Sequence, residues 1–592
     1  MLPLLTTCAM AQFGSAANDQ RVESLLAQMT LDEKIGQMTQ PDVHALAGHA
    51  DIQKYFLGSV LNGGGGGPTI NTPKNWLKAI NEYESWSLKT RLKIPLLYGV
   101  DAVHGHNNVD GAVIFPHNIG LGATHNPALV EQAERITALE VAGTGIRWTF
   151  APCIAVAQDE RWGRTYESFG DSPGLVSTLG AAAVRGFQGQ QLSDSSPVLA
   201  CAKHYVGDGG TVNGVDQGND VCDEATLRKL YLPPYEAAIK AGVGSIMVSY
   251  SSWNGQKMSG NKYLLSDILK GEMGFRGFLV SDWAGIDQIS PNYKDDVEKS
   301  INAGLDMVMI PYGPGQPNNF VEFIQDLKQL VAENKIPMTR IDDAVRRILR
   351  VKFEMGLFEN PGTDSTLTEA IGSAEHRAVA RECVRESVVQ LKNNNHTLPL
   401  AKNLKHLAVV GAAADDIGTQ CGGWTITWQG KSGNTLHGGT TILTAIRHSV
   451  GPGTQVAFSP DGSDLQGAEA VVVVVGEQPY AEMKGDRGDL NLAAADVALV
   501  EKAKSAGVPV VTLLISGRPL ILGNALDASD AFLAAWLPGT EGQGVADVLF
   551  GDYKPTGKLP RPWPRNNDGL ATAAQQSSVR APLFPQGFSL GN

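Results

Sequence analysis

Short apolar runs alternate with amphipathic stretches from the N-terminal region to about residue 358. In the amphipathic stretches, apolar residues recur at the three- and four-residue spacing of a helix with one buried face, as at 127–142, 175–187, 224–241, 264–273 and 320–332. The apolar runs have the length and composition of buried strands, and they lie at 59–61, 95–101, 146–152, 198–205, 245–251, 278–283 and 307–311. This alternation predicts an α/β fold, a (β/α)8-type, TIM-like barrel of about 250 residues, with its eighth strand still unplaced.

Signals at helix ends set the limits of this barrel. Thr30 and Glu33 form a capping box at the start of an early helix. A later helix over 339–355 begins at a Thr cap and stops before a glycine, and 360–364 has the composition of a turn. We therefore predict that the barrel spans 19–358.

A second α/β alternation follows. We interpret 359–384 as a linker with the start of a connecting helix, which runs over 373–393. Buried strands are predicted at 404–410, 468–477, 508–515 and 531–537, with helices at 492–506 and 542–550. This pattern predicts an α/β sandwich domain over 385–560 with a mostly parallel sheet. The remainder, 561–592, is rich in Pro, Asn, Gln and Ser and is interpreted as a surface extension.

The N-terminal segment 1–18 contains a short apolar run and the small-residue stretch 8–11. It resembles a truncated signal peptide that lacks a basic region, so we interpret it as a signal remnant or a disordered segment. We expect a secreted or periplasmic protein.

Composition excludes several classes of function. The net charge of −13 and the pI near 5.4 argue against nucleic acid as a partner, and no run of eighteen apolar residues predicts a membrane span. The six cysteines include no CxxC pair, so the sequence predicts no zinc ribbon and leaves open one or two disulfides. The oligomeric state, monomer or dimer, is equally open.

Two other local patterns lack the residues that a cofactor site requires. His104, His106 and His117 are not part of an HExxH or His/Cys set, so no metal site is predicted. The glycine run 63–67 is not followed by Gly-Lys-Ser/Thr, which favours a loop at the barrel mouth over a phosphate site. We expect no cofactor.

Polar residues at the ends of the predicted barrel strands are the candidates for chemistry. Asp282 directly follows the apolar run 278–281, and other strands end at Asp101, at Lys203 and His204, and at Tyr250. In a parallel barrel these ends meet on one face, where active sites lie. Helix capping by Asp282 and ordinary loop solvation are the alternatives.

Trp424 and Trp428 lie in a polar, glycine-rich stretch with little core pattern. A sugar ring, with its apolar face, is a natural partner for such an indole. A packed domain interface explains the two residues equally well.

Five stretches together resemble family 3 of the glycoside hydrolases, the two-domain β-glucosidases and β-glucan exohydrolases. The resemblance extends from about residue 20 to the tail, and the matching stretches are Tyr98 to Gly105, Arg161 to Arg164, Lys203 to Gly209, Val280 to Trp283 and Gly422 to Trp428. The family implies an exo-acting, retaining β-glucosidase that releases terminal glucose through a covalent glycosyl-enzyme. Its substrate would be a small oligosaccharide or an aryl or alkyl glucoside.

The resemblance also implies a role for each candidate. Asp282 matches the family's nucleophile, and Glu482, within Tyr480 to Asp486, matches an acid/base that comes from the second domain. Residues that would grip the glucosyl unit in the −1 subsite are Asp101, Arg164, Lys203, His204 and Tyr250. Residues that would form an aromatic clamp at the +1 subsite are Trp283 and Trp428, with Trp424 nearby.

The chain departs from the family's pattern at three positions. Ala284 and Gln288 stand where plant members often carry an acidic residue and an arginine, which affects the leaving-group subsite. Asp208 stands where the N-acetylglucosaminidase branch has a histidine, which disfavours that branch. The remaining alternatives are a β-xylosidase or transglycosylating relative, and a non-catalytic carbohydrate-binding protein.

Overall fold

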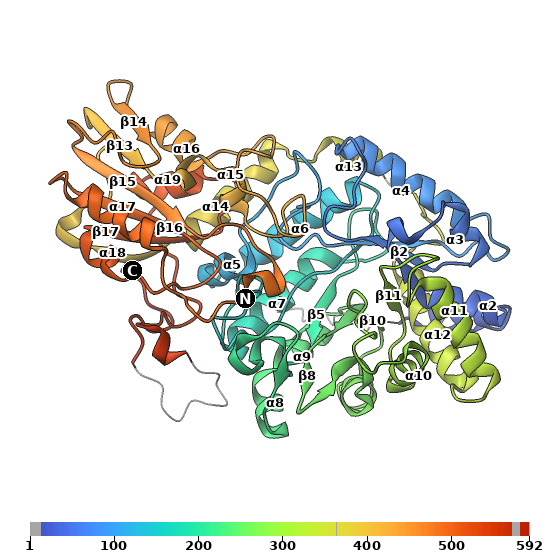
Figure 1. Ribbon diagram of the computed structural model, residues 1–592. Coiled ribbons are helices and arrows are strands. Elements are labelled where there is room, and N and C mark those ends of the chain that lie inside the picture. Colours follow the sequence, from blue (N-terminus) through green and yellow to red (C-terminus); the bar gives the residue numbers. More distant parts are fainter. Residues whose placement is uncertain (1–13, 363, 571–580, 591–592) are drawn as a thin grey trace, which may run out of the picture.

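The computed structural model describes residues 14–362, 364–570 and 581–590. Figure 1 shows two halves side by side, a barrel surrounded by helices and a second half built on an open sheet. Helix α14 (Ala374–Ser387) packs against α5 (Asn118–Thr124) and α6 (Pro127–Gly143), which joins the halves. Of the predicted N-terminal segment, 1–13 lies outside the described residues, and helix α1 begins at Ala16.

The first half is a closed barrel of parallel strands, which confirms the predicted fold. The strands are β1 (Thr39–Pro41), β2 (Ser59–Asn62), β3 (Leu97–Val100), β4 (Trp148–Thr149), β5 (Cys201–Tyr205), β7 (Ser245–Val248), β10 (Phe278–Ser281) and β11 (Val308–Ile310). Strands β2-β3-β4, β5-β7-β10 and β11-β1 pair in parallel register. Single parallel bridges close the remaining gaps, at Asp42–Leu61, Trp148–Leu199 and Val280–Met307. Strand β1 is the eighth strand that the sequence pattern left unplaced.

Helices enclose the barrel, and most follow the predicted ranges. Besides α5 and α6 they are α1 (Ala16–Leu26), α2 (Leu31–Gln37), α3 (Ala50–Lys54), α4 (Pro73–Ser87), α7 (Pro173–Gln188), α8 (Glu224–Leu230), α9 (Pro233–Lys240), the π-helix η6 (Tyr263–Glu272), α10 (Tyr293–Ala303), α11 (Phe320–Ala332), α12 (Met338–Glu354) and α13 (Ser365–Glu369). The capping box of Thr30 and Glu33 is confirmed.

Two helix predictions were wrong in detail. The stretch 224–241 forms two helices, because Pro233 and Pro234 restrict the backbone and remove two amide donors. Helix α12 is capped by Pro337 rather than by Thr339, which lies inside its first turn.

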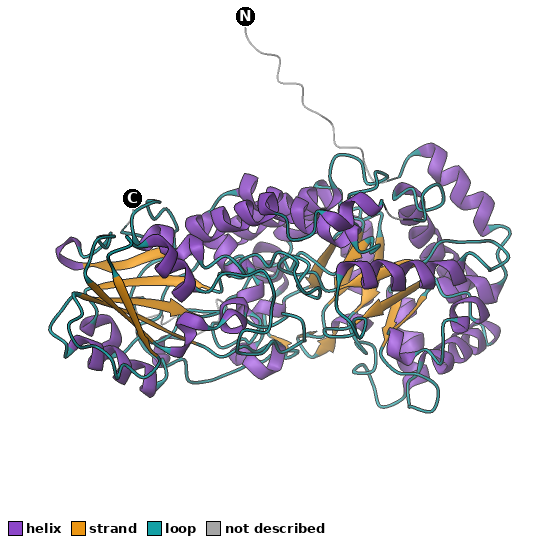
Figure 2. Ribbon diagram, turned by 90° about the horizontal axis from the view of Figure 1, so that it is seen from above, coloured by secondary structure: helices purple, strands orange, loops and turns teal. Residues whose placement is uncertain are grey.

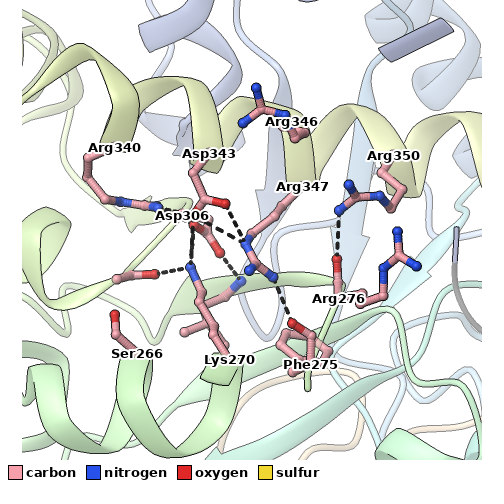
Figure 3. A network of polar contacts seen from close by, with 12 residues as sticks. Ser266, Lys270, Phe275, Arg276, Asp306, Arg340, Asp343, Arg346, Arg347 and Arg350 are labelled. Atoms are coloured by element: carbon pink, nitrogen blue, oxygen red, sulfur yellow. Dashed lines mark hydrogen bonds and ion pairs between the residues drawn. The ribbon is translucent and has the colours of Figure 1, made fainter. Parts of the chain in front are cut away.

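A network of charged side chains fastens α12 to the start of β10, at the end of the barrel opposite Asp282 (Figure 3). Asp306 is fully buried and accepts hydrogen bonds from the Leu279 backbone N–H at 2.8 Å, from Lys270 Nζ at 2.8 Å and from Arg340. Arg347 Nη1 donates to the Phe275 carbonyl at 2.8 Å. The network holds the base of the strand that carries the candidate nucleophile.

Asp306→Asn is expected to lower the free energy of unfolding by about 3–5 kcal/mol, because the Lys270 and Arg340 cations, whose side chains are 8% and 12% exposed, lose the fully buried carboxylate and keep only the partly exposed Asp343. Denaturant unfolding measures the loss. The matched control is Asp32→Asn, which breaks an exposed pair with Lys328 and should cost at most about 1 kcal/mol. Equal losses in the two variants would contradict the structural role of Asp306.

The second half contains a six-stranded sheet in the order β12-β17-β16-β15-β13-β14. Its strands are β12 (Val389–Asn393), β13 (His406–Val410), β14 (Gln455–Ser459), β15 (Ala470–Gly476), β16 (Val510–Ile515) and β17 (Ala531–Trp536). All neighbours are parallel except β12 and β17, which confirms the mostly parallel sheet.

Helices cover both faces of this sheet, as Figure 2 shows from above. They are α14 and α15 (Ile417–Cys421), α16 (Ile442–Ser449), α17 (Ala494–Lys504), α18 (Asn524–Ala528) and α19 (Gln543–Leu549). The helix predicted over 373–393 was wrong at its C-terminal end. It stops at Ser387, and the β-branched pair Val388-Val389 leads into the edge strand β12.

The C-terminal segment returns to the second half. Trp563 is fully buried, pairs with Phe584 and lies 6.0 Å from the ring of Trp536. The cysteines in the described ranges are all buried and free, so they form none of the disulfides that the sequence left open; Cys8 lies outside these ranges. None of the described helices has the length and apolar content that a bilayer crossing requires.

Candidate active site

A cavity of about 880 Å³ opens where the C-terminal ends of the barrel strands meet the second half. The barrel contributes residues at the ends of β3, β5, β7 and β10, which is where such barrels place their active sites. Every residue singled out from the sequence lines this cavity: Asp101, Arg164, Lys203, His204, Tyr250, Asp282, Trp283, Trp424, Trp428 and Glu482.

Asp282 has one anchored and one free carboxylate oxygen. The backbone N–H of Trp283 donates to Oδ1 at 2.7 Å. Oδ2 is buried and accepts no hydrogen bond from the described residues, with His204 Nε2 at 3.6 Å. An oxygen held in this way can attack an electrophilic carbon in the cavity without first breaking a strong hydrogen bond.

His204 is oriented by a buried carboxylate. Its Nδ1 lies 2.7 Å from Asp208 Oδ2, while Asp208 Oδ1 accepts hydrogen bonds from Ser249 and, at 3.1 Å, from Ser251. Burial opposes ionisation of Asp208, but His204 and these hydrogen bonds outweigh it and lower the pKa of the carboxyl. The sequence marked Asp208 only as a departure from the family, and the structure shows it to be the partner of His204.

Lys203 and Asp101 form an ion pair at the inner end of the cavity. Lys203 Nζ lies 3.0 Å from Asp101 Oδ1 and 5.6 Å from the centre of the Trp424 ring. Burial would lower the pKa of Lys203, but the Asp101 and Glu167 carboxylates outweigh it and raise that pKa. The pair places one charged donor and one charged acceptor where the hydroxyls of a sugar could bind.

Arg164 joins the two halves of the site. Its Nε and Nη2 atoms bind Glu167 at 2.9 and 3.0 Å, and its Nη1 lies 3.1 Å from Glu482 Oε1. Glu167 also accepts from the indole N–H of Trp424 at 3.1 Å. Sequence reasoning missed Glu167, although its i,i+3 spacing from Arg164 was a usable signal.

Glu482 enters the cavity from the second half. It begins the short helix η9 (Glu482–Gly485) with φ of +53°, and its side chain is 12% exposed. Burial raises the pKa of Glu482 to about 8; Arg164 opposes this shift and the negative charge of Asp282 adds to it. Glu482 therefore holds its proton at neutral pH and can donate it.

The loop that carries Glu482 is docked on the barrel by hydrogen bonds. Asp486 accepts from the backbone N–H groups of Gly163 and Asp216, both at 2.8 Å. The hydroxyl of Tyr166 donates to the Tyr480 carbonyl at 2.7 Å. These contacts fix the position of Glu482 from both sides.

Gly163→Ala is expected to lower kcat by about 10²-fold, because the new Cβ would lie 1.9 Å from the Glu482 carbonyl oxygen and must push that loop away. Steady-state kinetics on an aryl β-glucoside, the substrate that the sequence resemblance implies, measure the loss. In the control, Gly174→Ala adds a methyl group whose nearest neighbour is 3.9 Å away, and activity should not change. Full activity of Gly163→Ala would contradict this docking geometry.

The tryptophans lie at two depths. Trp283 is 36% exposed and Trp428 is partly buried, and both flank the glycine loop at the cavity mouth. A Cβ on Gly63 would lie 2.8 Å from the Trp283 ring, and one on Gly64 would lie 2.9 Å from Trp428 Cα. Trp424 is only 7% exposed and packs deeper, between Lys203 and Glu167.

Two histidines of the segment 104–117, His104 and His117, lie at the junction between the halves, whereas His106 contacts Thr144 within the barrel. The rings of His104 and His117 stack at 3.6 Å, and each places Nε2 within 3.2 Å of a main-chain carbonyl in 423–424. Burial lowers the pKa of His104 to about 4. Within the described ranges, no group of three or more His, Cys, Asp or Glu residues has the arrangement of a metal site.

Two carboxyl groups in contrasting environments, set at the mouth of a TIM-like barrel beside the indole rings of Trp283 and Trp428, define a glycoside-cleaving enzyme. Comparison with known families agrees. The N-terminal domain of glycosyl hydrolase family 3 matches residues 30–351, and the C-terminal domain of the same family matches 388–592. The chain belongs to glycosyl hydrolase family 3, which confirms the resemblance seen in the sequence.

Individual relatives match over nearly the whole chain. A lysosomal beta glucosidase of Dictyostelium discoideum is 34% identical over 97% of this chain and 76% of its own length. A periplasmic beta-glucosidase of Salmonella typhimurium is 33% identical over 96% and 77%. The crystal structure of an exo-1,3/1,4-beta-glucanase from a Pseudoalteromonas species superposes with a TM-score of 0.92 at 39% identity, covering 98% of this chain and 75% of that one.

Proposed function

We propose that the protein is an exo-acting, retaining β-glucosidase that releases terminal glucose from β-glucosides and short β-glucans. The observation that carries this proposal is the contrast between Asp282, with one unbonded oxygen in the cavity, and Glu482, whose raised pKa keeps it protonated. The names of the relatives, β-glucosidases and an exo-glucanase, support the substrate class.

The proposed reaction has two displacements. Asp282 Oδ2 attacks the anomeric carbon, and the bond to the leaving oxygen breaks as Glu482 transfers its proton to that oxygen. Glu482 is then a carboxylate, and it removes a proton from water as the water attacks the glycosyl-enzyme. Glucose leaves, Asp282 is again ionised and Glu482 is again protonated.

The inner residues suit a glucosyl unit. The ion pair of Lys203 and Asp101 offers a donor and an acceptor, and the imidazole of His204 lies between Asp208 and Asp282. Groups paired in this way bind sugar hydroxyls in the −1 subsite and are left unsatisfied by a sugar that lacks them. Arg164 and Tyr250 complete this wall, and Trp283 and Trp428 stack the leaving group at the mouth.

We also propose that the protein is exported. Two relatives carry the names lysosomal and periplasmic, which supports a compartment outside the cytosol. Cell fractionation of the full-length chain tests this proposal, and activity confined to the cytosol would contradict it.

Initial rates on the 4-nitrophenyl β-glucoside, β-xyloside and N-acetyl-β-glucosaminide test the substrate assignment. The glucoside should have the highest kcat/KM, by at least about tenfold over the xyloside, because the xyloside lacks the hydroxymethyl group that the pocket would hold. Release of single glucose units from a short β-glucan tests exo action, and retention of the β-anomer in the first product tests the double displacement. A faster xyloside would favour the β-xylosidase alternative.

A further inference from the structure

A chain of hydrogen bonds runs along one rim of the cavity and ends at a glutamine. It starts at Lys257, in the short strand β9 (Gln256–Lys257). Lys257 Nζ donates to the Tyr250 carbonyl at 2.8 Å, to the Gln217 carbonyl at 3.3 Å and to Gln288 Oε1 at 2.8 Å. Gln288 Nε2 in turn donates to Gln217 Oε1 at 2.8 Å.

The chemistry of the lysine fixes the direction of this chain. An ammonium group has three N–H donors and no acceptor, so Gln288 must turn its amide oxygen toward Lys257. The amide nitrogen of Gln288 then faces Gln217, which must accept through its own oxygen. Gln217 is therefore left with its NH2 group directed away from the chain, and no described residue binds that group.

The free end of the chain lies where a leaving group would bind. Gln217 and Gln288 line the cavity, whereas Lys257 does not. They lie on the side of Tyr250, whose hydroxyl donates to the Trp283 carbonyl at 2.6 Å. This rim is outside the inner pocket of Asp101 and Lys203. A change at the rim can therefore alter binding of the leaving sugar without altering binding of the glucosyl unit.

We propose that Lys257, Gln288 and Gln217 form a directional relay that presents an amide donor from Gln217 to a hydroxyl oxygen of a sugar leaving group. The inference rests on the proposed β-glucosidase function and goes further, because it names residues that select a sugar over an aryl or alkyl leaving group. Lys257 acts as a positioning residue, and Gln217 makes the contact. A sugar accepts this hydrogen bond, and a nitrophenyl ring has no hydroxyl to accept it.

Gln217→Leu tests the contact at the end of the relay. Leucine has nearly the size of glutamine and neither donates nor accepts a hydrogen bond, so the sugar hydroxyl loses its partner whichever way it is turned. The readout is the ratio of kcat/KM for a β-linked glucose disaccharide to kcat/KM for the 4-nitrophenyl β-glucoside. We expect this ratio to fall about tenfold, the effect of one lost hydrogen bond between the protein and the leaving group.

Two more variants separate the relay from other effects. Lys257→Met should also lower the ratio, and it keeps both glutamines. The matched control is Gln256→Leu, the same substitution next to Lys257 on an exposed side chain that does not line the cavity, and its ratio should equal that of the wild type.

An unchanged ratio in Gln217→Leu, or an equal loss on both substrates, would overturn the relay. A wild-type protein that fails to cleave the aryl β-glucoside would instead overturn the proposed function. Thermal unfolding of each variant identifies a loss of activity that comes from misfolding. If the first variant misfolds, Lys257→Met decides the outcome.

Discussion

Asp282→Asn is expected to lower kcat on a 4-nitrophenyl β-glucoside by at least about 10⁴-fold, as removal of a nucleophile does in other covalent enzymes. The amide has nearly the shape of the carboxylate, and its oxygen can still accept from the Trp283 backbone N–H. It cannot supply the anionic oxygen that now lies unbonded in the cavity. Steady-state kinetics should show the loss of turnover. Inhibition by glucose should show that glucose binding is retained.

Asp287→Asn is the matched control for this variant. Asp287 also lines the cavity, five positions further along the chain, but its Oδ2 already accepts a hydrogen bond from Asn318 at 2.9 Å. Its loss should be less than about tenfold. Near wild-type turnover in Asp282→Asn would show that another group is the nucleophile.

Glu482→Ala is expected to lower kcat/KM on a β-linked disaccharide by about 10²–10⁴-fold, the contribution of general acid catalysis. The loss should be much smaller on a dinitrophenyl glucoside, whose leaving oxygen needs little protonation. Added azide should then increase turnover and yield a glycosyl azide, because a small anion can replace the activated water. Absence of both effects would contradict the assignment of Glu482.

The pH profile gives a second measurement on the same residue. The pKa of Glu482 is raised to about 8, so the proton is present at neutral pH and is lost as the pH rises through that value. We expect kcat/KM of the wild type on a disaccharide to fall above about pH 8. In Glu482→Ala, assayed with the activated glucoside, this alkaline decline should disappear.

The barrel was predictable because its buried strands keep local patterns. Strands β3, β5 and β10 lie in apolar runs with polar residues toward their C-terminal ends, and those ends carry Asp101, Lys203, His204 and Asp282. Strand β1 carries no such signal. It is Thr39-Gln40-Pro41, and only closure of the barrel between β2 and β11 buries these residues. Similarly, Val389 to Asn393 follows a helix without a break, and its pairing with β17 comes from distant sequence.

The sequence predicted which residues line the cavity. It did not predict how deep each of them lies or which contacts hold the Glu482 loop in place. Trp424 and Trp428 lie four positions apart in one glycine-rich stretch, and the family resemblance placed Trp424 near the clamp of Trp283 and Trp428. The structure places Trp424 inside, against Lys203. The contacts of Gly163 with Asp486 and with the Glu482 carbonyl join segments more than 300 residues apart, a relationship that one sequence does not reveal.

The close fit between Gly163 and the Glu482 loop has a consequence for protein engineering. The barrel and the second half look like exchangeable modules, each with its own sheet. A chimaera that combines the barrel of one relative with the second half of another would retain both carboxyl groups. We expect it to be active only where residue 163 of the barrel fits the loop that carries residue 486. The choice of crossover points is therefore limited by this junction more than by the fold of either half.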